Sequence, residues 1–326
     1  MKTIFTIMSF VIATNCFAQI NTLYVEPNET DSAYKKTDTN YVCNKNSNYI
    51  VRNTKTNLNK LLLFLGGTKS NPKEYKIFSD FAGKLGYDVI NLSYPNSVLA
   101  AGLGCSSDSL AFNKYRQAIC YGTPGSSDVK VDTLNSIYTR TVKLINYLNK
   151  TYPKQKWEQY LKKDDPTTLD WSKITVGGHS QGGGHACYFA KFNKVERVLM
   201  FSSPNDYSYS FPKSANWLST PGVTSMNKHF AYLSVFDAKI PFYNQMMNIQ
   251  SLGLYPSYGA INVDTSSEPY GFSRCLYTAQ LTRLPLKLTS KIYHLLTIIL
   301  GSSINKSVWT YMLTSDVSIV SNECQK

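Results

Sequence analysis

A serine in a glycine-rich stretch carries the clearest chemical signal in this sequence. Ser180 stands in a G-x-S-x-G pattern that spans residues 178–182. The preceding residues 173–177 (KITVG) form a short apolar run typical of a buried strand, and a helix is expected to follow. A nucleophile on such a sharp turn needs very small residues two positions before and after it, which Gly178 and Gly182 provide. The pattern predicts a serine that attacks an acyl carbon.

A glycine-rich turn can also bind phosphate or simply allow close packing. The stretch GHSQGGG lacks the lysine of a P-loop and the G-x-G-x-x-G spacing of a dinucleotide site. A helix that begins directly after Ser180 would point free N–H groups at the negative charge of a tetrahedral intermediate. We therefore favour covalent catalysis over a phosphate-binding or packing turn.

A serine nucleophile needs a general base, and the chain has four histidines as candidates. His179 and His185 lie too close to Ser180 in sequence to reach its hydroxyl from the opposite side, so we interpret both as structural. His229 opens a strand and precedes the strongest acid candidate. His294 is the predicted base, in a segment interpreted as a loop that enters a final helix. A core or interfacial histidine is the alternative for this residue.

Two aspartates compete for the role of the acid that orients the base. Asp237 directly follows the apolar run 230–236 (FAYLSVF), at the carboxyl end of a predicted strand. Its alternative role is to cap the helix expected after it. Asp206 starts a long polar loop, in which aspartate side chains commonly stabilise turns. We predict that Asp237 orients His294, with Asp206 as the alternative acid.

Backbone N–H groups are expected to bind the oxyanion of the intermediate. One is the N–H of Gln181, which follows the serine. The second comes from the loop after the apolar run 60–65 (KLLLFL), from either Gly67 or Thr68. Glycines there suit the close approach of a substrate carbonyl, although a plain turn is the alternative.

The elements that must position these residues alternate along the chain. Buried strands are predicted at 60–65, 87–92, 173–177, 197–202 and 230–236, and helices at about 72–85, 133–149, from 181 onward and at 241–252. Repeated strand–helix–strand units require right-handed crossovers and a mostly parallel sheet that is covered by helices on both faces. The predicted fold class is α/β.

With these motifs, the chain resembles the α/β-hydrolase superfamily, and GHSQGGG resembles the nucleophile elbow of secreted lipases, cutinases and esterases. The resemblance covers roughly residues 58–313. It implies the order nucleophile, acid, histidine along the chain, which Ser180, Asp237 and His294 follow. It also implies a hydrolase of small-molecule or polymeric carboxylic esters that uses no cofactor and no metal. A peptidase or acyltransferase on the same triad and a catalytically silent binding protein are the alternatives.

The overall composition indicates a folded, exported protein. The 326 residues are 43% hydrophobic and only 17% charged, which excludes disorder for most of the chain. Residues 1–18 are predicted to be a signal peptide, so the localisation is expected to be secreted or periplasmic. Residues 19–58 are predicted to be irregular apart from a short strand near 49–52, and 59–326 to form the hydrolase domain. No transmembrane segment is expected after the signal.

The net charge of +13 is spread along the chain rather than clustered. This pattern favours a solvated cationic surface, with peripheral contact with anionic surfaces as the alternative, and nucleic acid is not an expected partner. The sequence does not define an oligomeric state.

The oxidising compartment expected after export favours disulfides. We predict that Cys105 and Cys120 form one, because they flank a loop with weak apolar anchoring. Cys187 is expected to be a free core thiol, and the pairing of Cys43, Cys275 and Cys324 stays open. No C-x-x-C spacing of a zinc or thioredoxin site occurs.

The long segment 203–228 is interpreted as a loop over the site. Its aromatic residues would either wall an acyl pocket or pack on the surface. They are Tyr207, Tyr209, Phe211 and Trp217.

Overall fold

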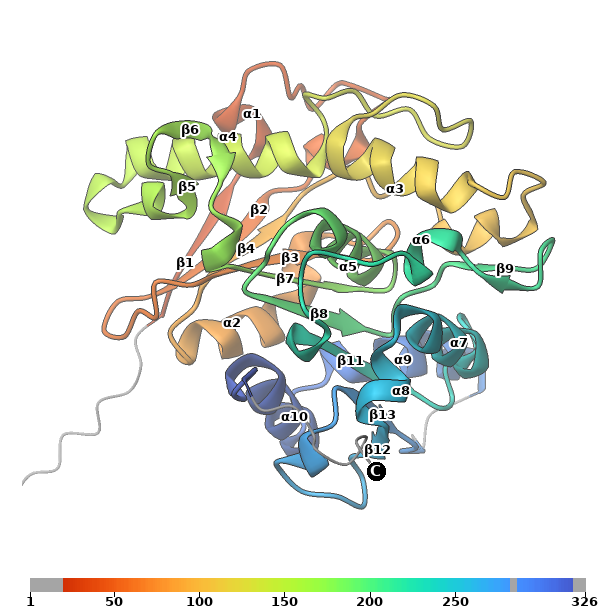
Figure 1. The fold of residues 1–326 in the computed structure, drawn as a ribbon. Coiled ribbons are helices and arrows are strands. Elements are labelled where there is room, and N and C mark those ends of the chain that lie inside the picture. The colour runs from red at the N-terminus through yellow and green to blue at the C-terminus, as the bar shows by residue number, and fades with distance from the viewer. Residues whose placement is uncertain (1–19, 282–285, 319–326) are drawn as a thin grey trace, which may run out of the picture.

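The protein is described by a computed structural model over residues 20–281 and 286–318. In this part of the chain, nine strands form one sheet in the order β1-β2-β4-β3-β7-β8-β11-β13-β12 (Figure 1). They are β1 (Ile20–Val25), β2 (Asn48–Asn53), β3 (Leu61–Leu65), β4 (Asp88–Leu92), β7 (Ile174–His179), β8 (Arg197–Phe201), β11 (His229–Ser234), β12 (Ala260–Asn262) and β13 (Cys275–Thr278). Neighbours pair in parallel from β4 to β12, whereas β2 runs antiparallel to both β1 and β4.

The central strands are apolar on both faces, as strands with helices on either side must be. All five side chains of β3 are fully buried. Alternation along the strand divides them between two clusters. Leu61, Leu63 and Leu65 pack into one cluster, and Leu62 and Phe64 pack into the other.

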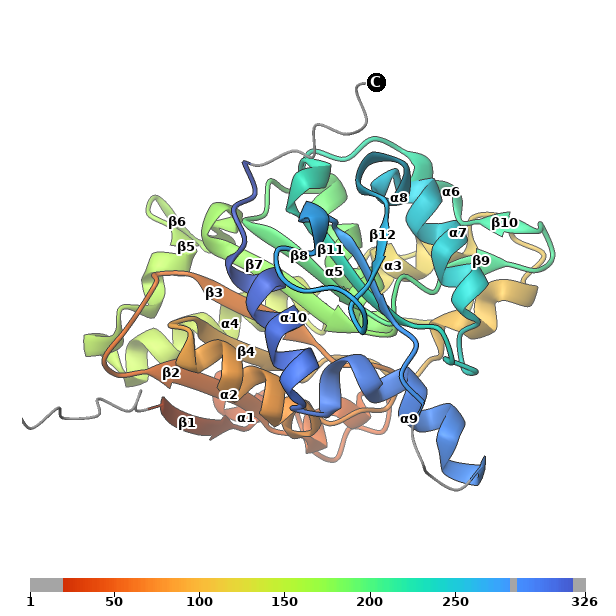
Figure 2. The same cartoon turned by 90° about the horizontal axis from the view of Figure 1, so that it is seen from below.

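Helices cover both faces of the sheet, so the molecule has three layers (Figures 1 and 2). The larger cluster takes residues from α3 (Ala111–Tyr121), α4 (Ile137–Thr151), α5 (Gln181–Phe192), α6 (Asn216–Ser219), α7 (Phe242–Leu252) and α8 (Leu254–Tyr258). The smaller cluster takes residues from α2 (Lys76–Lys84), α9 (Leu286–Ile299) and α10 (Ser303–Thr314). The predicted α/β class, with a mostly parallel sheet between two helical layers, is confirmed.

Shorter elements complete the described structure. They are α1 (Pro27–Thr30), the two-stranded pairs β5 (Leu161–Lys162) with β6 (Asp165–Leu169) and β9 (Tyr207–Ser208) with β10 (Lys213–Ser214), and 3-10 turns at Val42–Lys45, Pro72–Tyr75, Ala100–Cys105, Pro153–Gln155, Trp157–Tyr160, Trp171–Lys173, Met226–Lys228 and Tyr270–Phe272. None of the described helices has the length and apolar content to cross a membrane. The predicted signal peptide, residues 1–18, lies outside the described residues.

Two expectations about irregular segments are wrong. The strand expected near 49–52 is present within β2, but the residues before it are not all irregular, because β1 pairs with β2 in a six-residue antiparallel ladder at one edge of the sheet. The segment between Cys105 and Cys120 is not weakly anchored either, since it contains α3. That helix buries Phe112, Tyr115 and Ile119, which recur at helical spacing on one face.

The structure does not contain the predicted Cys105–Cys120 disulfide, and both residues are free thiols in it. Cys105 is exposed, whereas Cys120 points into the core from α3 and its Sγ lies 3.6 Å from Nδ1 of His185. Cys187 is a buried free thiol, as expected, and Cys43 and Cys275 are free and buried as well. Cys324 lies outside the described residues.

Candidate active site

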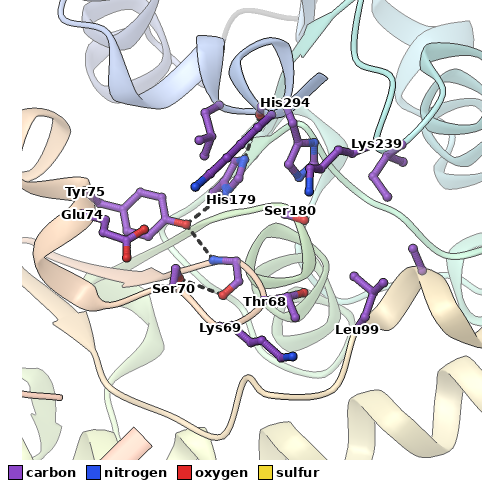
Figure 3. A pocket seen from close by; sticks show the side chains of 15 residues that line it. Thr68, Lys69, Ser70, Glu74, Tyr75, Leu99, His179, Ser180, Lys239 and His294 are labelled. Atoms are coloured by element: carbon purple, nitrogen blue, oxygen red, sulfur yellow. Dashed lines mark hydrogen bonds between the residues drawn. The ribbon is translucent and has the colours of Figure 1, made fainter. Parts of the chain in front are cut away.

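Ser180 occupies the turn between β7 and α5, at the carboxyl end of the parallel strands. Its backbone angles, φ 55° and ψ −126°, are strained for a residue with a side chain. Such angles are typical of the sharp strand-to-helix turn that exposes a nucleophile. The residue is only 5% exposed, and it lines a cavity of about 550 Å³ (Figure 3).

The two glycines that flank Ser180 are required by close backbone contacts. A Cβ atom on Gly182 would lie 2.0 Å from the carbonyl oxygen of Leu65, and one on Gly178 would lie 2.3 Å from the carbonyl carbon of Gly182. Both distances are far below van der Waals contact. The turn therefore depends on glycine at each position, as the sequence pattern indicates.

Gly67 and Thr68 line the cavity that holds Ser180, and Gln181 follows Ser180 directly in the chain. Gln181 is the first residue of α5, where a helix leaves its N–H free. The N–H of Gly67 donates to Oη of Tyr75 at 2.8 Å, so it is already engaged. In the described structure the N–H of Thr68 has no such partner, and the Thr68 hydroxyl donates to Oε1 of Gln181 at 2.7 Å. Of the two alternatives in this loop, Thr68 is the one with a free donor.

Asp237 and His294 are directly bonded. Nδ1 of His294 lies 2.6 Å from Oδ2 of Asp237. The other carboxylate oxygen accepts from the backbone N–H groups of Lys239 and Ile240, each at 3.0 Å. Nε2 of Gln245 donates to Oδ2 at 3.0 Å. These donors hold the buried carboxylate in one orientation, and it in turn fixes the tautomer of His294 with its proton on Nδ1.

His294 belongs to a helix and not to a loop that enters one, which corrects the sequence interpretation. It lies within α9, and its ring lines the same cavity as Ser180 (Figure 3). With Nδ1 bonded to Asp237, Nε2 is the nitrogen left for the cavity. In the described structure Oγ of Ser180 accepts from Nδ2 of Asn205 at 3.1 Å and has no direct bond to His294. Bonds of this kind are often long before substrate binds.

Asp206 lies elsewhere in a separate buried ion pair. Its carboxylate accepts two bonds from the guanidinium of Arg116, and Nε1 of Trp217 donates to Oδ2 at 2.7 Å. All three side chains are buried. The structure therefore brings Asp237 to His294, and it uses Asp206 to neutralise a buried arginine.

His185 and His229 lie outside the cavity. His185 stacks on Tyr115 in the core, and burial together with the nearby charge of Arg116 holds its pKa well below the usual value. His229 starts β11 and so lies at the amino end of the parallel strands, opposite Ser180. Burial lowers its pKa to about 4.

The cavity is walled by segments other than the expected loop. Its lining includes residues of 67–75, Leu99, Ala101, Ile240 and the turn of α9 around His294. No residue of 203–228 is among the lining residues of the described structure. Within that segment, Trp217 is buried beside Asp206, whereas Tyr209 and Phe211 reach solvent.

Three residues of the site were not anticipated from the sequence. They are Tyr75, which bonds the amide of Gly67, Asn205, which bonds Ser180, and Gln245, which bonds Asp237. Asn205 follows β8 at the same edge of the sheet as Ser180, so its position after a predicted strand could have indicated that it belongs to the site. Tyr75 and Gln245 come from elements whose packing no local pattern reveals.

Comparisons with known proteins add no family to this geometry. No protein-family model matches the chain, and no curated protein matches it either. Among the described residues, no group of three or more His, Cys, Asp or Glu side chains gathers in a way that could hold a metal ion.

Proposed function

We propose that this protein is a serine hydrolase of the α/β-hydrolase superfamily that cleaves carboxylic esters through an acyl-enzyme on Ser180. The observation that carries the proposal is one cavity that holds a strained serine and a histidine whose Nδ1 lies 2.6 Å from a buried aspartate. The chain order Ser180, Asp237, His294 and the position of the serine after a parallel strand support the superfamily assignment.

In the proposed first step, Nε2 of His294 takes the proton of the Ser180 hydroxyl while Oγ attacks the acyl carbon. The tetrahedral intermediate collapses when the protonated imidazole gives that proton to the departing alcohol oxygen. Asp237 keeps the imidazole in the productive tautomer and stabilises its charged form. His294 then takes a proton from the water that attacks the acyl-enzyme, and it gives this proton to Oγ of Ser180 as the acid departs.

The charge on the intermediate would be stabilised by two backbone donors. The N–H of Gln181 lies at the start of α5, where the helix dipole also favours negative charge. The N–H of Thr68 comes from the loop after β3, which is the second source of an oxyanion donor in this superfamily. The Thr68 hydroxyl also donates to the side-chain oxygen of Gln181, and this bond ties together the two residues that supply these backbone donors. Removal of one such donor typically costs 10²- to 10³-fold in turnover.

The predicted signal peptide supports export as part of this proposal. An exported ester hydrolase acts on substrates outside the cytoplasm, in the periplasm or the medium. Detection of a mature chain that begins at Gln19 by amino-terminal sequencing of the secreted protein would test the predicted cleavage site.

A fluorophosphonate probe tests the proposed nucleophile. Intact-mass analysis should show a single adduct that is lost in Ser180→Ala, because among the described serines only Ser180 combines a strained turn with a place in the cavity beside His294. Ser203→Ala is the matched control, since Ser203 is buried nearby and its hydroxyl has no partner within the described residues. Labelling that persists in Ser180→Ala would overturn the proposal. A panel of p-nitrophenyl esters and matching anilides then separates esterase from peptidase activity.

A further inference from the structure

Three lysines line the cavity that holds Ser180 and His294. They are Lys69, Lys239 and Lys291, and all three are exposed at its rim. Within the described residues none of them forms an ion pair, although several other lysines of the chain do. Among the lining residues that the structure describes, the one acidic side chain is Glu74, whose carboxylate accepts from the backbone N–H of Asn71. The mouth of the cavity therefore carries a net positive charge.

Two of these lysines flank the proposed base. Lys239 follows Asp237 by two residues and lies beside His294 in Figure 3. Lys291 precedes His294 by three positions on α9, so the two side chains share one face of the helix. Lys69 lies apart from them, directly after Thr68, at the oxyanion side of the cavity (Figure 3).

The mechanism assigns these two sides of the cavity to different parts of an ester. The departing alcohol oxygen receives its proton from His294, so the alcohol portion must lie next to that ring. The carbonyl oxygen points toward the amides of Thr68 and Gln181. A group on the alcohol portion would thus lie between Lys239 and Lys291.

We propose that the substrate is an ester whose alcohol portion bears an anionic group, such as a carboxylate or phosphate, bound by Lys239 and Lys291. This inference rests on the proposed function of Ser180 and His294. A cleft lined with one sign of charge raises the local concentration of an oppositely charged substrate. The preference for the anionic ester should decline as salt increases, because these lysines are solvent-exposed.

Two acetate esters of equal shape test the proposal. They are 4-carboxyphenyl acetate, which is anionic, and 4-carbamoylphenyl acetate, which is neutral. The ratio of their kcat/KM values is measured for the wild-type protein and for Lys239→Gln/Lys291→Gln. Comparing the two ratios cancels the difference in intrinsic reactivity between the two esters. The ratio should fall about tenfold, roughly threefold for each exposed lysine.

The control variant Lys150→Gln/Lys306→Gln removes the same charge from exposed positions outside the cavity. It should leave the ratio unchanged. If the ratio of kcat/KM values in Lys239→Gln/Lys291→Gln equals the wild-type ratio, the proposal is overturned. A ratio that falls only in Lys69→Gln would overturn the assignment of the anion to the alcohol side.

A binding measurement separates this inference from the proposed function. Titration calorimetry with 4-hydroxybenzoate and 4-hydroxybenzamide requires no turnover. Preferential binding of the benzoate that is lost in Lys239→Gln/Lys291→Gln supports the anion site, even if neither ester is hydrolysed and the hydrolase proposal fails. Equal binding of the two compounds overturns the anion site, even if both esters are hydrolysed.

Discussion

Nε2 of His179 lies 2.9 Å from the backbone carbonyl oxygen of His294. The residue before the proposed nucleophile therefore holds the helix that carries the proposed base. Oγ of Ser202 donates to the same carbonyl at 2.8 Å. Nδ1 of His179 accepts from Oη of Tyr75 at 3.1 Å, and that oxygen accepts from the N–H of Gly67. One buried series of hydrogen bonds thus joins the loop after β3, the turn at Ser180 and α9.

Tyr75→Phe should break this chain in the middle. It leaves the N–H of Gly67 and Nδ1 of His179 without their partner in the core, and each buried unsatisfied group costs about 1–3 kcal/mol. We expect a lower free energy of unfolding in urea and a lower kcat, because the loop and α9 lose their common anchor. Tyr243→Phe, on an exposed tyrosine of α7, is the control. Equal kcat and stability for Tyr75→Phe and wild type would refute the positioning role.

Asp237→Asn and Asp206→Asn should have opposite effects. The amide at 237 holds His294 in the wrong tautomer, and the comparable change in a serine protease lowered kcat by about 10⁴. The amide at 206 leaves the buried charge of Arg116 unpaired, and breaking such a pair costs about 3–5 kcal/mol. Ester turnover and thermal unfolding, measured on both variants, check this. Loss of turnover at normal stability in Asp206→Asn would transfer the role of the acid to that residue.

Gly182→Ala should disrupt the elbow. The added methyl group would meet the carbonyl oxygens of Leu65 and Gly66, and backbone atoms cannot rotate away as a side chain does. We expect a loss of several kcal/mol in stability or no soluble protein. Gly102→Ala is the matched control, because a Cβ atom there has no neighbour within 4 Å. Similar melting temperatures for the two variants would contradict this view of the turn.

The free energy of unfolding should decrease as the pH drops below about 6.5, because buried histidines are neutral in the folded protein. Burial lowers the pKa of His229 from 6.5 to about 4. Between these values the unfolded chain binds more protons than the folded one, so the free energy of unfolding decreases as pH falls. The shift corresponds to about 3 kcal/mol, fully present above pH 6.5 and lost near pH 4. His229→Gln can still donate to the carbonyl of Ser225, and it should flatten the urea-unfolding free energy over this range. An unchanged pH slope in that variant would exclude His229 as the cause.

Among the cysteines that the structure describes, Cys105 should be the thiol that reacts in the native protein. It is exposed, whereas burial raises the pKa of the Cys187 and Cys275 thiols to about 12 and leaves little thiolate. Cys43 and Cys120 are buried as well. Brief treatment with iodoacetamide followed by peptide mapping should modify Cys105 and spare these four until urea is added. Recovery of an intact peptide pair cross-linked through Cys105 would contradict the free thiol.

The elbow could be predicted because all its determinants lie in one short window. The strand, the flanking glycines and the helix start are adjacent in sequence, and each has a distinct local signature. The choice between Asp206 and Asp237 could be predicted only as a preference, since both follow strands and both precede His294. What separates them physically is Arg116, which lies 90 residues before Asp206 and reaches it through the packing of α3.

Other features could not be predicted either, because they too depend on packing that a local sequence pattern does not reveal. The amide of Gly67 is engaged by Tyr75, a contact that depends on how the Pro72–Tyr75 turn folds back. Helix α3 buries Arg116 and Cys120 beside its apolar residues, and these two residues interrupt the hydrophobic pattern that would otherwise indicate its buried face. Strand β1 is half-exposed and pairs with β2 alone, and such edge strands have weak patterns of their own.

The separation of Ser180, Asp237 and His294 along the chain has a consequence for biogenesis. The turn at Ser180 and the sheet around β7 can form once the middle of the chain has been synthesised, but α9 follows every strand of the sheet. A partly delivered chain thus holds its serine without its histidine. Contacts of such long sequence separation form late and slowly. The acyl transfer that we propose would then require nearly the whole polypeptide, because Ser180 and His294 come together only when α9 packs.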